Sequence, residues 1–174
     1  TLTLHRIANM TFPRWYPTAT LLPSGMVTIM GGTVLPGASS AKNPIYEIWD
    51  PSNPTQLLFR RQSTGMITKT KDIYYPHTYV LPTGDLFMMC AAYGEITEPM
   101  NTTVRATLPS WFDVAPHLYM EYPYTGTSVM LPLTPDNGYT PEVVLFGGQY
   151  MGAYVNTTAS SLALRITVKY NETT

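Results

Sequence analysis

The sequence predicts an all-β protein built from repeated antiparallel hairpins. Its 174 residues include 16 prolines and 12 glycines, a density of turn formers that favours many short strands. Three segments of the chain also share one order of features: an apolar strand, a Pro-x-Gly turn or a longer version of it, and a second apolar strand that ends in small residues. Hydrophobic residues make up 44% of the chain, which is typical of a globular protein with a packed core.

The first unit begins with a hairpin over residues 15–32. A run of Thr, Ala, Leu and Tyr leads into the turn Pro23-Ser24-Gly25, where a missing N–H group costs least, and a second apolar run ends at Gly31-Gly32. A third strand is expected at residues 45–49 and a fourth at residues 55–59. The first unit is therefore predicted to contain four strands.

The same features return in a second unit around Pro82-Thr83-Gly84 and in a third unit that ends at Gly147-Gly148. The third turn is longer and contains Asp136-Asn137-Gly138, in which Asn or Gly can adopt a positive φ. A β-sandwich would also alternate and turn often. Recurrence of the same ordered features favours a kelch-type β-propeller segment of about three four-stranded antiparallel blades. We place these blades at residues 10–60, 68–113 and 118–170.

The charge composition argues against a nucleic-acid partner. Only 12% of the residues are charged and the formal net charge is −1, so no basic face is expected to neutralise a phosphate backbone. No apolar run reaches the roughly 18 residues of a membrane span. The single cysteine, Cys90, leaves no intrachain disulfide framework and no structural zinc site built on thiolates.

Three Asn-x-Thr sequons, at Asn101, Asn156 and Asn171, indicate a secreted, extracellular glycoprotein. Such sequences accept N-linked glycans only in the secretory pathway, although one or two would arise by chance in a chain this rich in Ser and Thr. All three are expected in loops or at strand ends, where an oligosaccharide can reach solvent. We therefore predict secretion and N-glycosylation.

The chain also contains a series of short words in a fixed order. They are Arg14-Trp15-Tyr16, Leu22-Pro23-Ser24-Gly25, Tyr75-Pro76-His77, Leu81-Pro82-Thr83-Gly84, and a stretch from Tyr122-Pro123 through Leu131-Pro132 to Gly147-Gly148. Together, over residues 10–166, these words resemble the glyoxal oxidases, relatives of galactose oxidase among the copper radical oxidases. The order of the words and the long third turn carry the resemblance, since any single hairpin would be a weak signal.

The resemblance implies a propeller of seven blades, of which this chain looks like the second to fourth. In that family two tyrosines and two histidines hold copper, and one of the tyrosines is joined to a cysteine and carries a radical. The Arg-x-Tyr word maps this tyrosine onto Tyr16. The partner cysteine would lie in the preceding blade, Cys90 stands in a different element, and the remaining ligands would lie beyond Thr174. The resemblance therefore implies copper in the full family site and none in this chain alone.

The other candidate residues have simpler interpretations. Without its partner ligands, Tyr16 is also explained as an aromatic residue packed between blades. His77 is expected to pack or to form a hydrogen bond, and His5 and His117 lack a second ligand at a useful spacing. Cys90 is expected to be a buried small hydrophobe because no base or cation lies beside it. The acidic residues are expected on scattered turns, which argues against a glycosidase pair; they are Asp85, Glu95, Glu98, Asp113, Glu121, Asp136 and Glu142.

Two functions remain open from the sequence. The first is a segment of a copper radical oxidase that converts aldehydes to acids with release of hydrogen peroxide, the 174 residues alone being inactive. The second is a non-catalytic extracellular structural or interaction glycoprotein. In either case the end blades would expose strand edges and apolar faces. The expected partners are therefore the remaining propeller blades or other copies of the chain, together with N-linked glycans.

Overall fold

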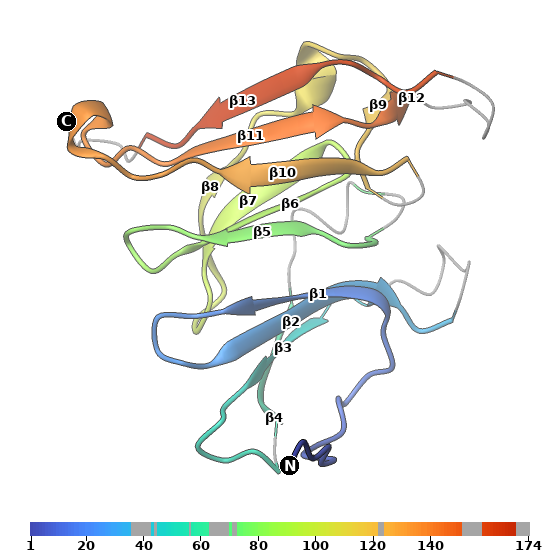
Figure 1. The fold of residues 1–174 in the computed structure, drawn as a ribbon, viewed down its shortest axis with the longest axis vertical. Helices are drawn as coiled ribbons and strands as arrows, with labels where there is room; N and C mark the ends of the chain where they lie inside the picture. The colour runs from blue at the N-terminus through green and yellow to red at the C-terminus, as the bar shows by residue number, and fades with distance from the viewer. Residues whose placement is uncertain are drawn as a thin grey trace.

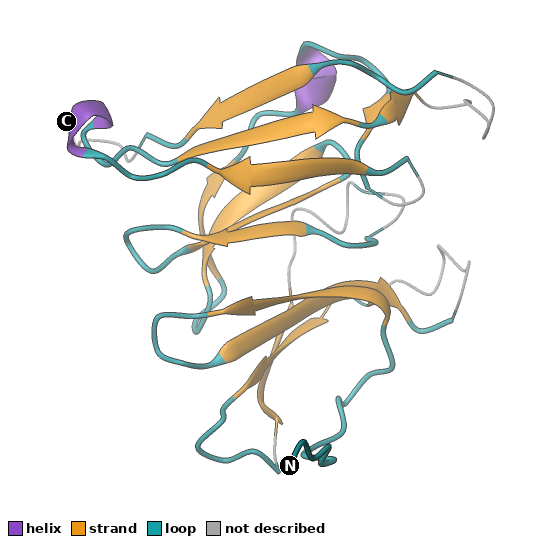
Figure 2. Ribbon diagram, viewed as in Figure 1, coloured by secondary structure: helices purple, strands orange, loops and turns teal. Residues whose placement is uncertain are grey.

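The prediction of an all-β fold is confirmed: the described residues form three main antiparallel sheets that follow one another in the chain and stack along one direction (Figure 1). The computed structural model describes residues 1–35, 43, 45–55, 57–62, 70, 73–121, 124–150 and 158–169, and for residues 57–62 only the backbone. Figure 2 shows that strands and loops make up nearly all of this part of the chain. In the described part, no helix is long and apolar enough to cross a membrane.

The first sheet has the strand order β1-β2-β3-β4. Its first turn is closed by a hydrogen bond of 2.9 Å from the Gly25 N–H to the Leu22 carbonyl, with Gly25 at φ +83°. Glycine fits here because a side chain would strain this backbone conformation. The fourth strand starts two residues later than expected. The strands are β1 (Trp15–Leu21), β2 (Val27–Thr33), β3 (Ile45–Trp49) and β4 (Leu57–Gln62).

The second sheet repeats this order as β5-β6-β7-β8. Every residue of the second strand, from Leu86 to Cys90, is buried. This strand has a paired strand on each side, and its two faces pack against the adjacent sheets. A continuous apolar run is the pattern expected for a strand covered on both faces. The strands are β5 (His77–Val80), β6 (Leu86–Cys90), β7 (Tyr93–Glu98) and β8 (Thr103–Thr107).

The third sheet contains three described strands, in the order β10-β11-β13, where the sequence led us to expect four. The strands are β10 (Gly126–Met130), β11 (Glu142–Gly147) and β13 (Ala163–Thr167). A separate two-stranded ladder joins β9 (Leu118–Tyr119) to β12 (Gln149–Tyr150). The long third turn forms a short 3-10 helix, Pro135–Asn137, which ends at Gly138 in the left-handed conformation. The turn residues identified in the sequence therefore form the turn.

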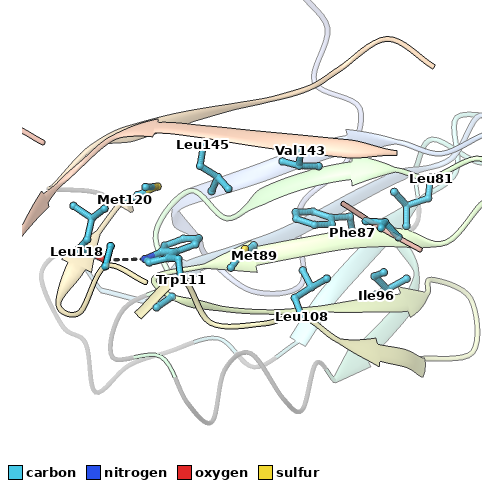
Figure 3. Packing of buried hydrophobic residues seen from close by; sticks show 13 residues of the cluster. Leu81, Phe87, Met89, Ile96, Leu108, Trp111, Leu118, Met120, Val143 and Leu145 are labelled. Carbon is cyan, nitrogen blue, oxygen red and sulfur yellow. Dashed lines mark hydrogen bonds between the residues drawn. The ribbon is translucent and has the colours of Figure 1, made fainter. Parts of the chain in front are cut away.

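The largest hydrophobic cluster lies between the second and third sheets (Figure 3). Phe87 and Met89 of β6 contribute from one side, and Val143 and Leu145 of β11 contribute from the other. The indole N–H of Trp111 donates a 2.7 Å hydrogen bond to the Leu118 carbonyl, so the buried polar atom of this residue is paired. A smaller cluster joins the first and second sheets. There the buried hydroxyl of Tyr46 donates a 2.7 Å hydrogen bond to the Pro99 carbonyl.

Candidate functional site

The first strands of the three sheets, β1, β5 and β10, lie next to one another (Figure 1). The hydroxyls of Thr20 and Thr78 form a hydrogen bond between β1 and β5, and a 2.6 Å hydrogen bond joins the hydroxyls of Tyr79 and Ser128 between β5 and β10. These strands border an open depression of about 500 Å³, which we call the inner-strand groove. Its lining residues are 18–21, 75–79 and 126–128.

Tyr16 stands near the start of β1, two residues before Thr18 of the inner-strand groove, in a left-handed backbone conformation with φ +68°. Its ring stacks on Trp15 at a centroid distance of 3.9 Å and on Tyr75 at 4.8 Å, and Tyr74 meets it edge-on at 5.7 Å. A positive φ is rare for an aromatic residue and marks a position that its surroundings must hold in place. The tyrosine that the resemblance singles out is therefore embedded in an aromatic cluster.

The paired glycines of β2 make room for this arrangement. A Cβ atom on Gly32 would lie 2.6 Å from the Trp15 carbonyl oxygen, and one on Gly31 would lie 2.6 Å from the Ile73 carbonyl oxygen. The backbone on both sides therefore approaches β2 closely. The Tyr75 N–H then donates a 3.0 Å hydrogen bond to the Tyr16 carbonyl, which fixes the start of β5 against the start of β1.

A buried ion pair that the sequence did not lead us to expect lies two residues before Tyr16. Arg14 Nε lies 3.0 Å from Glu47 Oε2, and both side chains are completely buried. A signal was present in the sequence: Glu47 interrupts the apolar third strand, and a charged residue at such a position requires a partner.

His77 connects the second sheet to the third. Its Nδ1 lies 2.8 Å from the Ser128 hydroxyl, which also bonds the Tyr79 hydroxyl. Its Nε2 is buried without a hydrogen-bond partner. Burial lowers the pKa of His77 to about 4, because desolvation disfavours the imidazolium form. The imidazole is therefore neutral at pH 7, and the expectation of a hydrogen-bonding histidine is confirmed.

The remaining candidates are two histidines and the cysteine. His5 and His117 are exposed, and Cys90 is completely buried with its Sγ 3.8 Å from the Tyr74 carbonyl, as expected for a small hydrophobe. Across the described ranges, no group of three or more His, Cys, Asp or Glu side chains is arranged to hold a metal ion. The resemblance assigns one copper ligand to this part of the chain, the phenol oxygen of Tyr16. Phenolate and imidazole donors suit Cu(II).

The prediction that the acidic residues lie on scattered turns is wrong for several of them. Glu95 and Glu98 belong to β7 and Glu142 belongs to β11, because the backbone of each pairs with a neighbouring strand. Glu95 and Glu121 are buried. Of the three sequons, Asn101 lies on an exposed turn between β7 and β8, whereas Asn156 and Asn171 fall outside the described residues.

Comparison with known proteins agrees with the resemblance in the sequence. The family model described as the glyoxal oxidase N-terminus matches residues 4–170. The chain is 31% identical over 144 residues to the aldehyde oxidase GLOX of Vitis pseudoreticulata, covering 82% of this chain and 24% of that protein. It is 29% identical over 162 residues to Art an 7 of Artemisia annua, which its name marks as a candidate aldehyde oxidase, covering 86% of this chain and 25% of that protein. The chain thus spans about a quarter of these relatives. It belongs to the glyoxal oxidase N-terminus family.

Proposed function

We propose that this chain is part of a secreted copper radical oxidase that converts aldehydes to carboxylic acids. In the balanced reaction, one aldehyde, one dioxygen and one water give one carboxylic acid and one hydrogen peroxide. The single observation that carries the proposal is the setting of Tyr16. In a chain of the glyoxal oxidase family, the matching tyrosine stands two residues before Thr18 of the inner-strand groove, in a strained backbone conformation and within an aromatic cluster.

Tyr16 would provide one oxygen ligand to copper, and copper would supply one-electron redox chemistry when bound. The other ligands would come from parts of the protein outside this chain, which spans a quarter of its relatives. We therefore expect the isolated 174 residues to be inactive. The remaining blades are proposed to cover the third sheet, on which Val129 and Phe146 are exposed.

Secretion and glycosylation belong to the same proposal. Asn101 is exposed on a turn, and its backbone N–H donates a 2.7 Å hydrogen bond to Glu98 Oε2, so the turn is held by backbone and carboxylate rather than by the asparagine side chain. That side chain is therefore available to carry a glycan without loss of a described contact.

The test measures hydrogen peroxide release from the full-length protein, loaded with copper and supplied with methylglyoxal. The Tyr16→Phe variant keeps the aromatic ring and removes only the phenol oxygen, so we expect its rate to fall to that of the copper-free protein. Tyr139→Phe is the matched control, because Tyr139 also has a positive φ (+56°) but is 58% exposed on the long third turn. We expect this control to keep the wild-type rate.

Two results would contradict the proposal. A wild-type protein that binds copper but releases no peroxide with a panel of aldehydes would leave the non-catalytic extracellular glycoprotein as the better interpretation. A Tyr16→Phe variant with the wild-type rate would show that Tyr16 is not a copper ligand.

A further inference from the structure

The Arg14–Glu47 pair ties the segment before Tyr16 to two strands at once. Beyond its 3.0 Å contact with Glu47, the guanidinium of Arg14 donates hydrogen bonds to the Gly31 carbonyl of β2, at 2.9 Å, and to the Ile45 carbonyl of β3. The second oxygen of Glu47 accepts a 2.7 Å hydrogen bond from the Thr11 N–H. We call Arg14, Glu47 and these contacts the Arg14 clamp.

Fold stability alone is a poor explanation for this clamp. Both side chains are completely buried, so each charge has lost its contact with water, and this desolvation opposes the attraction between them. Replacing a completely buried ion pair with apolar residues of similar size is often neutral or stabilising. A buried pair of this kind is therefore better explained by the geometry that it imposes on the surrounding backbone.

The residue that needs a fixed geometry lies two positions along the chain. A non-glycine residue held at φ +68° costs about 1–3 kcal/mol and persists only where its neighbours over-determine it. On one side of Tyr16, the next blade holds the carbonyl through the Tyr75 N–H. On the other side, the planar fork of Arg14 is fixed to the backbone of β2 and β3, and a guanidinium makes such bonds with one defined orientation.

We propose that Arg14 and Glu47 are positioning residues that set the backbone of Tyr16 so that its phenol oxygen is directed for copper binding. This inference rests on the proposed function, since it assigns a purpose to the setting of Tyr16. Neither residue touches the metal. Residues that orient a ligand in this way commonly change metal affinity by about ten- to a hundredfold when they are replaced.

The main test uses the full-length protein with the double substitution Arg14→Met and Glu47→Met, which removes both buried charges together. We expect the metal-free protein to stay folded, because no charge is left unpaired and only the hydrogen bonds to the carbonyls of Gly31 and Ile45 and from the Thr11 N–H are lost. Copper affinity should fall about tenfold or more, and the phenolate-to-copper absorption band should weaken. The matched control is Arg165→Met with Glu142→Met, an ion pair of 3.6 Å in the third sheet whose arginine side chain is 63% exposed.

A second variant covers the case in which the double variant does not fold. Arg14→Lys keeps a cation for Glu47 but lacks the fork that reaches the carbonyls of Gly31 and Ile45, so we expect about a tenfold loss of copper affinity with the fold retained.

The possible results separate this inference from the proposed function. Folded clamp variants with wild-type copper affinity and an unchanged absorption band would overturn the positioning role, whatever their melting temperature. A Tyr16→Phe variant with wild-type copper affinity would instead overturn the proposed function on which the role rests. Loss of affinity in Tyr16→Phe and in the clamp variants, with the control unchanged, supports both.

Discussion

The backbone N–H of Tyr75 donates a 3.0 Å hydrogen bond to the carbonyl oxygen of Tyr16, and the two phenol rings stack with their centroids 4.8 Å apart. Both residues have a positive φ, +49° for Tyr75 and +68° for Tyr16. Two strained aromatic residues from neighbouring blades therefore support each other at the edge of the inner-strand groove. Substitutions in the full-length protein can test how this region and the sheets around it are held.

Gly32→Ala is expected to destabilise the protein by more than about 3 kcal/mol, because the left-handed conformation penalises a side chain and the new Cβ would lie 2.6 Å from the Trp15 carbonyl oxygen. Gly25→Ala is the matched control. Gly25 has a similar φ of +83°, but a Cβ atom there would meet no heavy atom within 4 Å, so this variant should lose only about 1–2 kcal/mol. Equal losses in chemical denaturation would show that close approach at β2 does not matter.

His77 is expected to make stability depend on pH. Burial lowers its pKa in the folded protein to about 4, below the ordinary value of 6.5, so the unfolded chain binds more protons between these values. Above about pH 6.5, His77 is neutral in both the folded and the unfolded protein and does not reduce the free energy of unfolding. As the pH drops towards 4, this free energy falls by up to about 3 kcal/mol because the unfolded chain takes up a proton at His77. His77→Asn, which can keep a hydrogen bond to Ser128, should flatten this dependence. An unaltered curve for His77→Asn would refute the assignment.

Tyr46→Phe is expected to cost about 1–3 kcal/mol, because the hydroxyl donates a buried 2.7 Å hydrogen bond to the Pro99 carbonyl across the first and second sheets. The substitution keeps the ring and so isolates the hydrogen bond. Tyr150→Phe serves as the control, since Tyr150 is 44% exposed. Guanidinium denaturation with an unchanged midpoint for Tyr46→Phe would show that this link does not hold the two sheets together.

Asn101 is expected to carry an N-linked glycan when a eukaryotic cell secretes the protein, because the sequon is exposed on the turn between β7 and β8. Peptide mapping after endoglycosidase treatment should find the mark of a removed sugar at this position, and Thr103→Ala should abolish it. An unmodified Asn101 in secreted wild-type protein would count against the glycoprotein interpretation.

Local sequence signals predicted the hairpins well. The turns at Pro23-Ser24-Gly25 and Pro82-Thr83-Gly84 fall between paired strands, because turn chemistry and alternation depend on neighbouring residues. The fourth strand was placed too early because the turn after Trp49 extends further, with the Trp49 indole N–H bonded to the Pro54 carbonyl at 3.1 Å. A side chain that stabilises a longer turn is hard to anticipate from propensity alone.

The setting of the candidate site could be predicted only in part. The Arg-x-Tyr word led to Tyr16, but the stacking on Tyr75 joins residues from different blades and depends on how the sheets pack. Glu47 in an apolar strand indicates that a buried partner is needed, but the Arg14–Glu47 pair spans 33 positions, so no local pattern identifies Arg14 as that partner. Sequence reasoning singled out Tyr16 but not the residues that pack against it and hold its backbone, because those contacts are long-range.

Because Cys90 is completely buried, the reaction of its thiol with a labelling reagent can report local opening of the folded protein. The thiol lies on β6, in the middle of the second sheet, with its Sγ 3.8 Å from the Tyr74 carbonyl. A labelling reagent can reach it only when this sheet separates from its neighbours, so the rate of thiol modification reports that event. Tyr74 packs edge-on against Tyr16, and the same rate would therefore measure how often the aromatic cluster itself loosens.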